Sequence, residues 1–248
     1  MARRGRASRL QGRVAVRPPP TSTPLDENPV AKDPLTQRRQ AAAEFKPGRI
    51  LLIACGALAR EILDINASNQ FNHIDLTCLP ANLHLYPDQI PAAVTVAVTK
   101  HRACYSQIFV VYADCGTGGA LARRCAELGV EMVSGPHCYS FFEGNQAFED
   151  KTEAGEITAF YLTDFLVKQF DAFIWRPMGL DKNPELREMF FGNYTKLVYQ
   201  SQVSDPALVQ RAADCATRLG LAFEHRHTGY GDLEITLRDW AGSAPSSG

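Results

Sequence analysis

The sequence predicts an α/β fold, in which a mostly parallel sheet carries helices on both faces in three layers. Between residues 49 and 240, apolar runs of strand length alternate with segments that have the composition of helices. The predicted strands are apolar throughout, which is typical of strands that are buried on both faces. Short connections between strands and helices favour parallel neighbours. No low-complexity linker interrupts this range, so we predict a single domain over residues 49–240.

The first half of this range predicts four strands, each followed by a helix. The strands are residues 50–54, 73–79, 108–112 and 130–133, and the helices are residues 57–65, 87–100, 119–128 and 139–149. Pro91 must lie in the first turn of its helix, where its missing N–H costs nothing. Gly129 fits the carboxyl-terminal cap of the helix before it.

The second half predicts further strands and longer helices. Residues 157–162 suit a strand, and Thr163 or Asp164 would cap a helix that runs to about Phe173. Asn183-Pro184-Glu185 has the pattern of a helix start, and the apolar spacing after it predicts an amphipathic helix to about residue 200. Another helix is predicted from Asp205-Pro206 to Gly220. The chain would then end in two strands, residues 221–227 and 233–237.

The two ends of the chain differ from this core. Residues 1–48 carry six arginines before the first acidic residue, Asp26, together with a proline run, and we predict a basic, proline-rich, disordered leader. A basic arm that touches RNA or a partner is the alternative. No apolar segment follows the arginines, so the leader is not a secretory signal. Residues 241–248 are predicted to form a flexible tail.

Composition narrows the class of protein. A net charge of −1 over 248 residues gives no electrostatic case for binding nucleic acid or an anionic membrane. The longest apolar runs fall far short of the roughly 20 residues that span a bilayer. Seven cysteines, an odd number spread thinly along the chain, argue against a disulfide framework. We therefore expect a cytoplasmic protein with reduced thiols and a small-molecule substrate.

Three cysteines directly follow predicted strands. Cys55 and Cys115 each precede a glycine at the end of an apolar run, and Cys138 follows the strand 130–133. In a parallel sheet the carboxyl ends of the strands share one edge, where open α/β folds bind ligands. A helix amino terminus also favours the thiolate, which binds metal or attacks an electrophile. With His84, in the loop after the second strand, these thiols are predicted to hold a divalent metal, with zinc as the expected ion.

Two residues beside these cysteines are candidates for proton transfer. His137 adjoins Cys138 and could act as a general base or as a further metal ligand. Asp114 adjoins Cys115 and is the nearest acid, with Glu143 and Asp164 as the other acids close to this edge.

The glycines after Cys115 suggest an anion site. Gly116, Gly118 and Gly119 precede a predicted helix, so their N–H groups could cradle a phosphate or carboxylate of a small substrate. The loop lacks the full dinucleotide-binding pattern and the P-loop lysine. A nucleotide site is therefore only weakly supported.

Several of these residues stand in segments that resemble a known protein family. The segments are Ala54-Cys55-Gly56, Leu83-His84-Leu-Tyr-Pro87, Tyr112-Ala-Asp-Cys115-Gly116, Cys138 to Gly144, and Tyr161-Leu162-Thr163. On this pattern, over roughly residues 49 to 230, the chain is similar to the uncharacterised bacterial and archaeal family DUF1638. Many members have an extra residue between the histidine and the third cysteine, so the equivalence of His137 stays open. The resemblance implies an association with corrinoid-dependent methyl transfer from methylated amines, and so with one-carbon metabolism, but no established activity.

Three functions fit these observations, and the sequence does not decide between an enzyme and a binding protein. The leading hypothesis is a cytoplasmic metalloprotein for small-molecule or methyl-group chemistry, with four ligands: Cys55, His84, Cys115 and Cys138. The second is a metal-free enzyme with Cys115 as the nucleophile and His84 or His137 as the base. The third is a non-enzymatic accessory partner of corrinoid methyltransferase components, and a corrinoid would enter only through such a partner.

Overall fold

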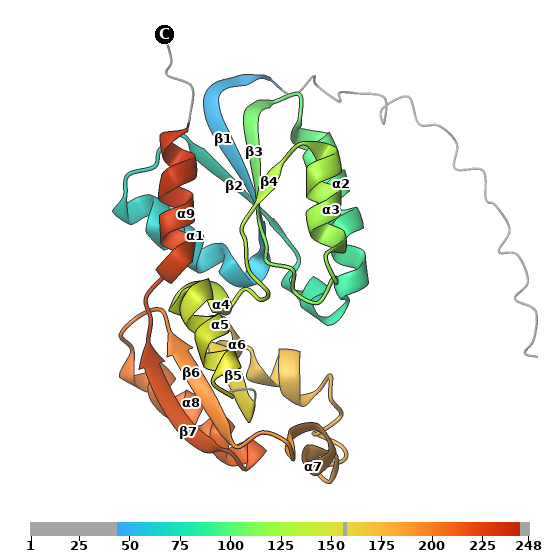
Figure 1. The fold of residues 1–248 in the computed structure, drawn as a ribbon, viewed down its shortest axis with the longest axis vertical. Coiled ribbons are helices and arrows are strands. Elements are labelled where there is room, and N and C mark those ends of the chain that lie inside the picture. Colours follow the sequence, from blue (N-terminus) through green and yellow to red (C-terminus); the bar gives the residue numbers. More distant parts are fainter. Residues whose placement is uncertain (1–43, 156–157, 244–248) are drawn as a thin grey trace, which may run out of the picture. The chain divides into compact units, whose positions relative to one another are not determined.

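The computed structural model describes residues 44–155 and 158–243, which contain two sheets (Figure 1). The strand order is β2-β1-β3-β4 in the first sheet and β5-β6-β7 in the second. Every neighbouring pair in these sheets is parallel. Parallel strands with helices between them confirm the predicted α/β class. The division of the strands between two sheets is a feature that the sequence did not predict.

The first sheet is built around β1. Its strands are β1 (Lys46–Cys55), β2 (Ile74–Leu79), β3 (Tyr105–Val111) and β4 (Glu131–Met132). Its helices are α1 (Ala59–Ser68), α2 (Ile90–His101), α3 (Ala120–Leu128) and α9 (Gly231–Gly242). Residues 50–54 of β1 are buried almost completely, as expected for the central strand of a covered parallel sheet. In Figure 1, α2 and α3 lie together beside one face of the sheet, and α1 and α9 lie beside the other.

The second sheet has β6 at its centre. Its strands are β5 (Ala159–Thr163), β6 (Lys196–Ser201) and β7 (Ala222–His227). The helices in this part of the chain are α4 (Ser140–Glu143), α5 (Asn145–Glu153), α6 (Asp164–Lys168), α7 (Leu186–Phe191) and α8 (Pro206–Leu219). Leu162, Leu197 and Tyr199 belong to a core that α8 covers. In a separate hydrophobic cluster, Tyr139 and Phe148 pack against Tyr161 and Val198.

Several helix ends follow the signals in the sequence. Asp205 caps α8, because its carboxylate accepts hydrogen bonds from the N–H groups of Ala207 and Leu208 at 2.9 and 3.3 Å. Gly220 and Gly129 end α8 and α3 in the left-handed conformation that glycine adopts without strain. Thr163 caps α6 and accepts a hydrogen bond from the N–H of Leu166. The sequence therefore predicts these boundaries through local chemistry.

The predicted helix that runs to about residue 200 is wrong in its second half. α7 ends at Phe191, and the strand β6 begins at Lys196. Leu197 and Val198 continue the helical spacing of the apolar residues before them by coincidence. Both are completely buried in the central strand of the second sheet, where a continuous apolar run is required.

The predicted last strand, residues 233–237, is also wrong, because these residues belong to α9. Leu233, Leu237 and Trp240 recur with helical spacing and are buried. The Trp240 ring stacks on Phe109 of β3, with ring centroids 4.4 Å apart. The predicted helix 139–149 exists, but Gly144, at φ 91°, divides it into α4 and α5.

The predicted boundaries of the domain are only partly open to comparison. Residues 1–43 and 244–248 lie outside the described residues, as does Ile157 of the predicted strand 157–162. Residues 46–48 of the predicted leader belong to β1, and α9 reaches Gly242 of the predicted tail. Within residues 44–155 and 158–243, no helix has the length and apolar character that a bilayer crossing requires. The single-domain and cytoplasmic assignments stay predictions.

Candidate functional site

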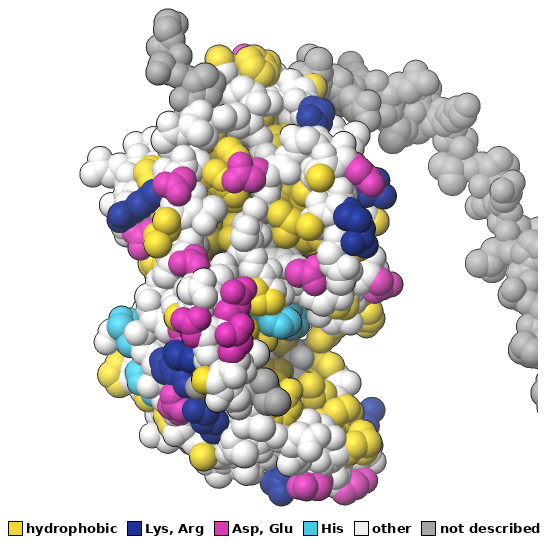
Figure 2. All heavy atoms as spheres, in the orientation of Figure 1, with side chains coloured by type: hydrophobic (Ala, Val, Ile, Leu, Met, Phe, Trp, Pro, Cys, Tyr) yellow, Lys and Arg dark blue, Asp and Glu magenta, His cyan; other side chains and the backbone are white. Residues whose placement is uncertain are grey.

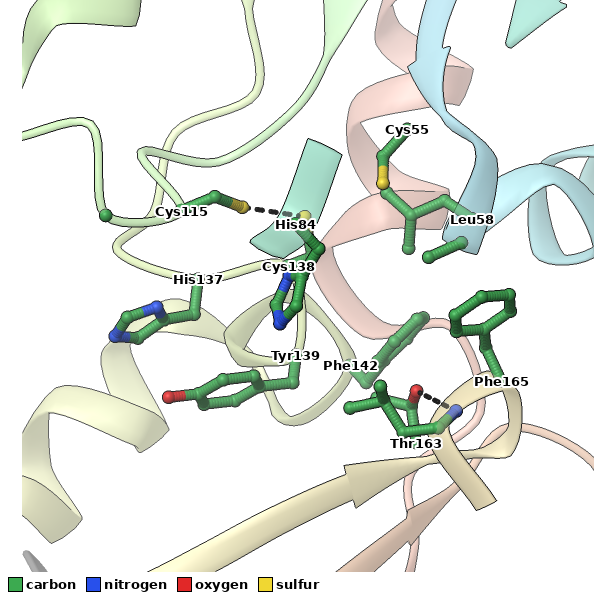
Figure 3. A pocket seen from close by; sticks show the side chains of 13 residues that line it. Cys55, Leu58, His84, Cys115, His137, Cys138, Tyr139, Phe142, Thr163 and Phe165 are labelled. Carbon is green, nitrogen blue, oxygen red and sulfur yellow. Dashed lines mark hydrogen bonds between the residues drawn. The ribbon is translucent and has the colours of Figure 1, made fainter. Parts of the chain in front are cut away.

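A cavity of about 310 Å³ gathers most of the residues that the sequence singles out (Figure 3). The predicted site residues in its lining are Cys55, His84, Cys115, Gly116, His137 and Cys138. Asp114, Gly118 and Gly119 do not line it. The rest of the lining is largely apolar and includes Ala57, Leu58, Tyr139, Phe142, Thr163, Phe165 and Leu166.

The strand ends bring the thiols together. Cys55 is the last residue of β1, Cys115 follows β3, and Cys138 follows β4. The segments that follow β3 and β4 stay paired with each other. The N–H groups of Asp114 and Cys115 donate to the carbonyls of Gly135 and Pro136 at 3.0 Å. These backbone bonds hold the loops of Cys115 and Cys138 side by side at the carboxyl edge of the sheet.

Cys115 and Cys138 form a close thiol pair, with their Sγ atoms 3.1 Å apart (Figure 3). The hydrogen bond from Cys138 stabilises the thiolate of Cys115 and lowers the pKa of Cys115, although burial opposes the shift. The same contact, together with burial, raises the pKa of Cys138. Cys115 is therefore the more acidic thiol of the pair, and Cys138 is the less acidic one. Cys115 also has a positive φ of 48°, which is uncommon outside glycine.

Cys55 differs from this pair because it is almost fully buried. It is 4% exposed, and burial raises the pKa of its thiol to about 11. Tyr112, at the end of β3, is 1% exposed, and burial followed by the nearby Cys55 and Cys138 raises its pKa. Its hydroxyl is buried without a hydrogen-bond partner of normal geometry in the described residues. In the sequence, Tyr112 stands out only as part of the family-like segment that ends in Cys115 and Gly116.

Both predicted histidines line the cavity. His84 lies on a short 3-10 helix, Ala81–Leu85, after β2, and burial lowers the pKa of its imidazole. Burial also lowers the pKa of His137, although the charge of Asp114 opposes the shift. The His137 ring stacks on Tyr139 with centroids 4.8 Å apart. The lowered pKa values favour neutral imidazoles, which can accept a proton or bind a metal.

Asp114 binds the loop that follows it. Its carboxylate accepts hydrogen bonds from the Thr117 hydroxyl at 2.7 Å and from the N–H groups of Gly118 and Gly119 at 3.0 and 2.6 Å. Burial would raise the pKa of Asp114, but these hydrogen bonds outweigh it and lower the pKa. Two N–H groups of the predicted anion cradle are thus already bonded within the chain, and of the three glycines only Gly116 reaches the cavity.

The other acids near this edge are held by partners outside the cavity. Glu143 pairs with Lys151 and with Arg226, whose Nη1 lies 3.0 Å from Glu143 Oε1. Asp164 is 1% exposed and accepts a hydrogen bond from the Tyr199 hydroxyl at 2.7 Å. Neither acid lines the cavity, and both interact with other residues of the fold.

The apolar wall of the cavity was missed by the sequence reasoning. Tyr139 and Phe142 come from the segment around α4, whereas Thr163 and Phe165 come from the end of β5 and the start of α6. The Tyr139 ring stacks on Tyr161 of β5, with centroids 5.3 Å apart. Two of the segments that resemble the family, Cys138 to Gly144 and Tyr161-Leu162-Thr163, contain residues of this wall.

The predicted metal ligands share the cavity without forming a ligand cluster. Within the described residues, no group of three or more His, Cys, Asp or Glu side chains is arranged to hold a metal ion. Two thiolates on one tetrahedral zinc, each at about 2.3 Å, would lie about 3.8 Å apart. The sulfurs of Cys115 and Cys138 are closer, at 3.1 Å. Zinc binding would therefore require side-chain rearrangement, and it stays a prediction.

Comparison with known proteins identifies a family. A family model described as a protein of unknown function, DUF1638, matches residues 78–237. The matched range contains His84, Cys115, His137 and Cys138, and it leaves out Cys55. No curated protein and no solved structure matches the chain. Because the match spans more than half of the chain, the chain belongs to the DUF1638 family.

Proposed function

We propose that this DUF1638 protein binds a small molecule in the cavity and acts on it with Cys115 as a nucleophile. The proposal is carried by the 3.1 Å contact between the Cys115 and Cys138 sulfurs, inside a cavity that two imidazoles also line. A neighbouring thiol that donates a hydrogen bond stabilises a thiolate, and the thiolate is the attacking form of cysteine.

The lining of the cavity supports a small and largely uncharged substrate. Leu58, Phe142 and Phe165 provide apolar and aromatic surface, and no lysine or arginine among the described residues lines the cavity. A volume of about 310 Å³ is at the lower end of the range for ligand pockets. Such a site favours a compact ligand over a nucleotide.

The reaction step uses groups that all line the cavity. The Cys115 sulfur would form a bond to the electrophilic atom of the substrate, and the leaving group would depart with the electron pair of the broken bond. His84 or His137 would first take the thiol proton of Cys115 and then give it to the leaving group.

Labelling with iodoacetamide at mildly acidic pH tests the nucleophile. We expect peptide mass spectrometry to find Cys115 alkylated before the other cysteines. Cys78 is the reference cysteine for this comparison. The residue is exposed, but partial burial of its thiol group raises the pKa of that thiol. The Cys78→Ser variant is expected to leave the labelling rate of Cys115 unchanged. Faster labelling of Cys78 than of Cys115 in the wild-type chain would refute the proposal.

A divalent metal is the second candidate, because Cys55, His84, Cys115 and Cys138 line one cavity and are all groups that bind zinc. A metal there would bind a substrate thiol or polarise a substrate oxygen. Elemental analysis of protein purified without chelators is expected to find stoichiometric metal that Cys115→Ser loses and Cys78→Ser retains. Wild-type protein without stoichiometric metal would rule this candidate out.

A place in one-carbon metabolism rests on the family resemblance. The resemblance implies an association with corrinoid methyltransferase components, and the cavity is compatible with a methyl group as the transferred unit. Isolation of the native protein together with such components, without turnover on methylated amines, would favour an accessory role over an enzyme.

A further inference from the structure

The sulfurs of Cys115 and Cys138 lie close to each other, at 3.1 Å. A disulfide bond is about 2.05 Å long, so the two sulfurs need to approach by only about 1 Å. Cys115 and Cys138 are 23 residues apart in the chain and come from different loops. The backbone bonds from Asp114 to Gly135 and from Cys115 to Pro136 hold these loops together. The pair is therefore fixed by the sheet and does not depend on a bond between the sulfurs.

Both cysteines line the same cavity. Cys115 and Cys138 are each partly exposed, and both line the cavity, whereas exposed Cys78 does not. Figure 3 shows the two side chains directed toward each other from separate loops. A ligand bonded to the sulfur of Cys115 would thus lie beside the sulfur of Cys138.

We propose that Cys115 and Cys138 form a dithiol–disulfide couple that reduces a small-molecule disulfide bound in the cavity. This inference rests on the proposed function, because it takes Cys115 as the attacking thiol, and it names the substrate class as a compact, uncharged disulfide. The neighbouring thiol gives the site a way to release a covalent adduct, which a single nucleophilic cysteine lacks.

Two exchange steps make up the reaction. The Cys115 sulfur attacks one sulfur of the substrate, the substrate disulfide breaks, and the first product thiol leaves with the proton of Cys115. The Cys138 sulfur then attacks the Cys115 sulfur of the mixed disulfide, and the second product thiol leaves with the proton of Cys138. Two electrons pass from the two cysteines to the substrate, and a Cys115–Cys138 disulfide remains. An external dithiol restores the pair by the reverse exchange.

Bis(2-hydroxyethyl) disulfide is a suitable probe, because it is uncharged and small enough for the cavity. The full chain is treated with the probe, its free thiols are blocked, and peptides are mapped without reduction. We expect a Cys115–Cys138 cross-link in the wild-type chain and in the Cys78→Ser control. In Cys138→Ser the reaction should stop at a mercaptoethanol adduct on Cys115, and circular dichroism confirms that the variant is folded.

Two results would overturn the inference. In the wild-type chain, an adduct that persists on Cys115, or a cross-link from Cys115 to Cys55, would show that Cys138 does not resolve the mixed disulfide. If Cys115 reacts first with iodoacetamide but forms no cross-link, only this inference fails. If Cys115 reacts with neither reagent, the proposed function fails with it.

Discussion

The buried contact between Tyr199 and Asp164 allows a direct test of the role of this acid. The Tyr199 hydroxyl donates to Asp164 Oδ1 at 2.7 Å, and both residues are at most 1% exposed. Phenylalanine at position 199 would keep the ring and its stacking on His225, and would remove only the hydroxyl. A hydrogen bond to a charged group contributes about 1.5–3 kcal/mol. We expect Tyr199→Phe to lower the free energy of unfolding by about 2 kcal/mol.

Urea unfolding followed by circular dichroism measures this loss. The slope m should not change, because the variant exposes the same surface on unfolding. In a thermal melt, the same loss should lower Tm by about 4–8 °C for a chain of this size. Tyr86→Phe is the matched control, since Tyr86 is 52% exposed, and it should stay within about 0.5 kcal/mol of wild type.

The same variants separate a structural acid from a proton-transfer acid. The Asp164 carboxylate also accepts hydrogen bonds from the N–H groups of Gln202 and Val203 at 3.2 and 3.3 Å, and it does not line the cavity. We therefore expect Tyr199→Phe to label at Cys115 as fast as wild type. A loss of stability no larger than that of Tyr86→Phe, or slower labelling of Cys115, would refute this reasoning.

Three further substitutions test local features of the fold. Hydrogen bonds, first of all from Arg49, hold the pKa of Asp75 below its usual range. Their stabilisation is present above the unfolded pKa of about 3.9 and is lost as the pH falls through the lower folded value. Asp75→Asn should therefore be less stable than wild type at pH 7 by about 1 kcal/mol, and urea titrations at decreasing pH should show the difference vanishing. Asp205→Ala removes the cap of α8 and should cost about 1 kcal/mol in a thermal melt, whereas Asp205→Asn should cost little. Gly231 has φ 49°, and a Cβ there would collide with carbonyl oxygens of α4. In urea unfolding, Gly231→Ala should therefore cost about 3 kcal/mol. Gly242→Ala, at an open position, should stay within about 0.5 kcal/mol of wild type.

Local chemistry explains what the sequence could predict. The strand β1 was predictable because a run of five buried apolar residues followed by Cys55-Gly56 has few other interpretations. Caps such as Asp205 and Gly220 act within one turn of their helix, so their signals do not depend on the rest of the fold. The meeting of Cys115 with Cys138 follows from parallel strands that end at one edge.

Long-range packing explains what the sequence could not predict. Leu197 and Val198 fit a helix or a strand equally well by spacing, and only their burial in the centre of the second sheet decides. The apolar wall of the cavity includes Phe165, and the spacing of the cysteines does not predict that Phe165 lies there. The geometry of a metal site could not be predicted either, because a shared edge fixes which residues meet, but not the distances between their ligand atoms. In the part of the chain that the structure describes, no group of three or more His, Cys, Asp or Glu side chains is arranged to hold a metal ion.

Different parts of the chain supply the reactive thiols of the cavity and the apolar wall that selects its ligands. The second sheet lies in the sequence between β4 and α9, and α9 returns to the first sheet, where the Trp240 Nε1–H donates to Glu131 Oε1 at 2.8 Å. The thiol pair belongs to the loops of the first sheet, whereas Phe165 comes from the start of α6. Changes at Phe165 should therefore alter which molecules fit, because they change the wall of the cavity. They should leave the approach of the two sulfurs intact, because the backbone bonds between the loops after β3 and β4 fix it.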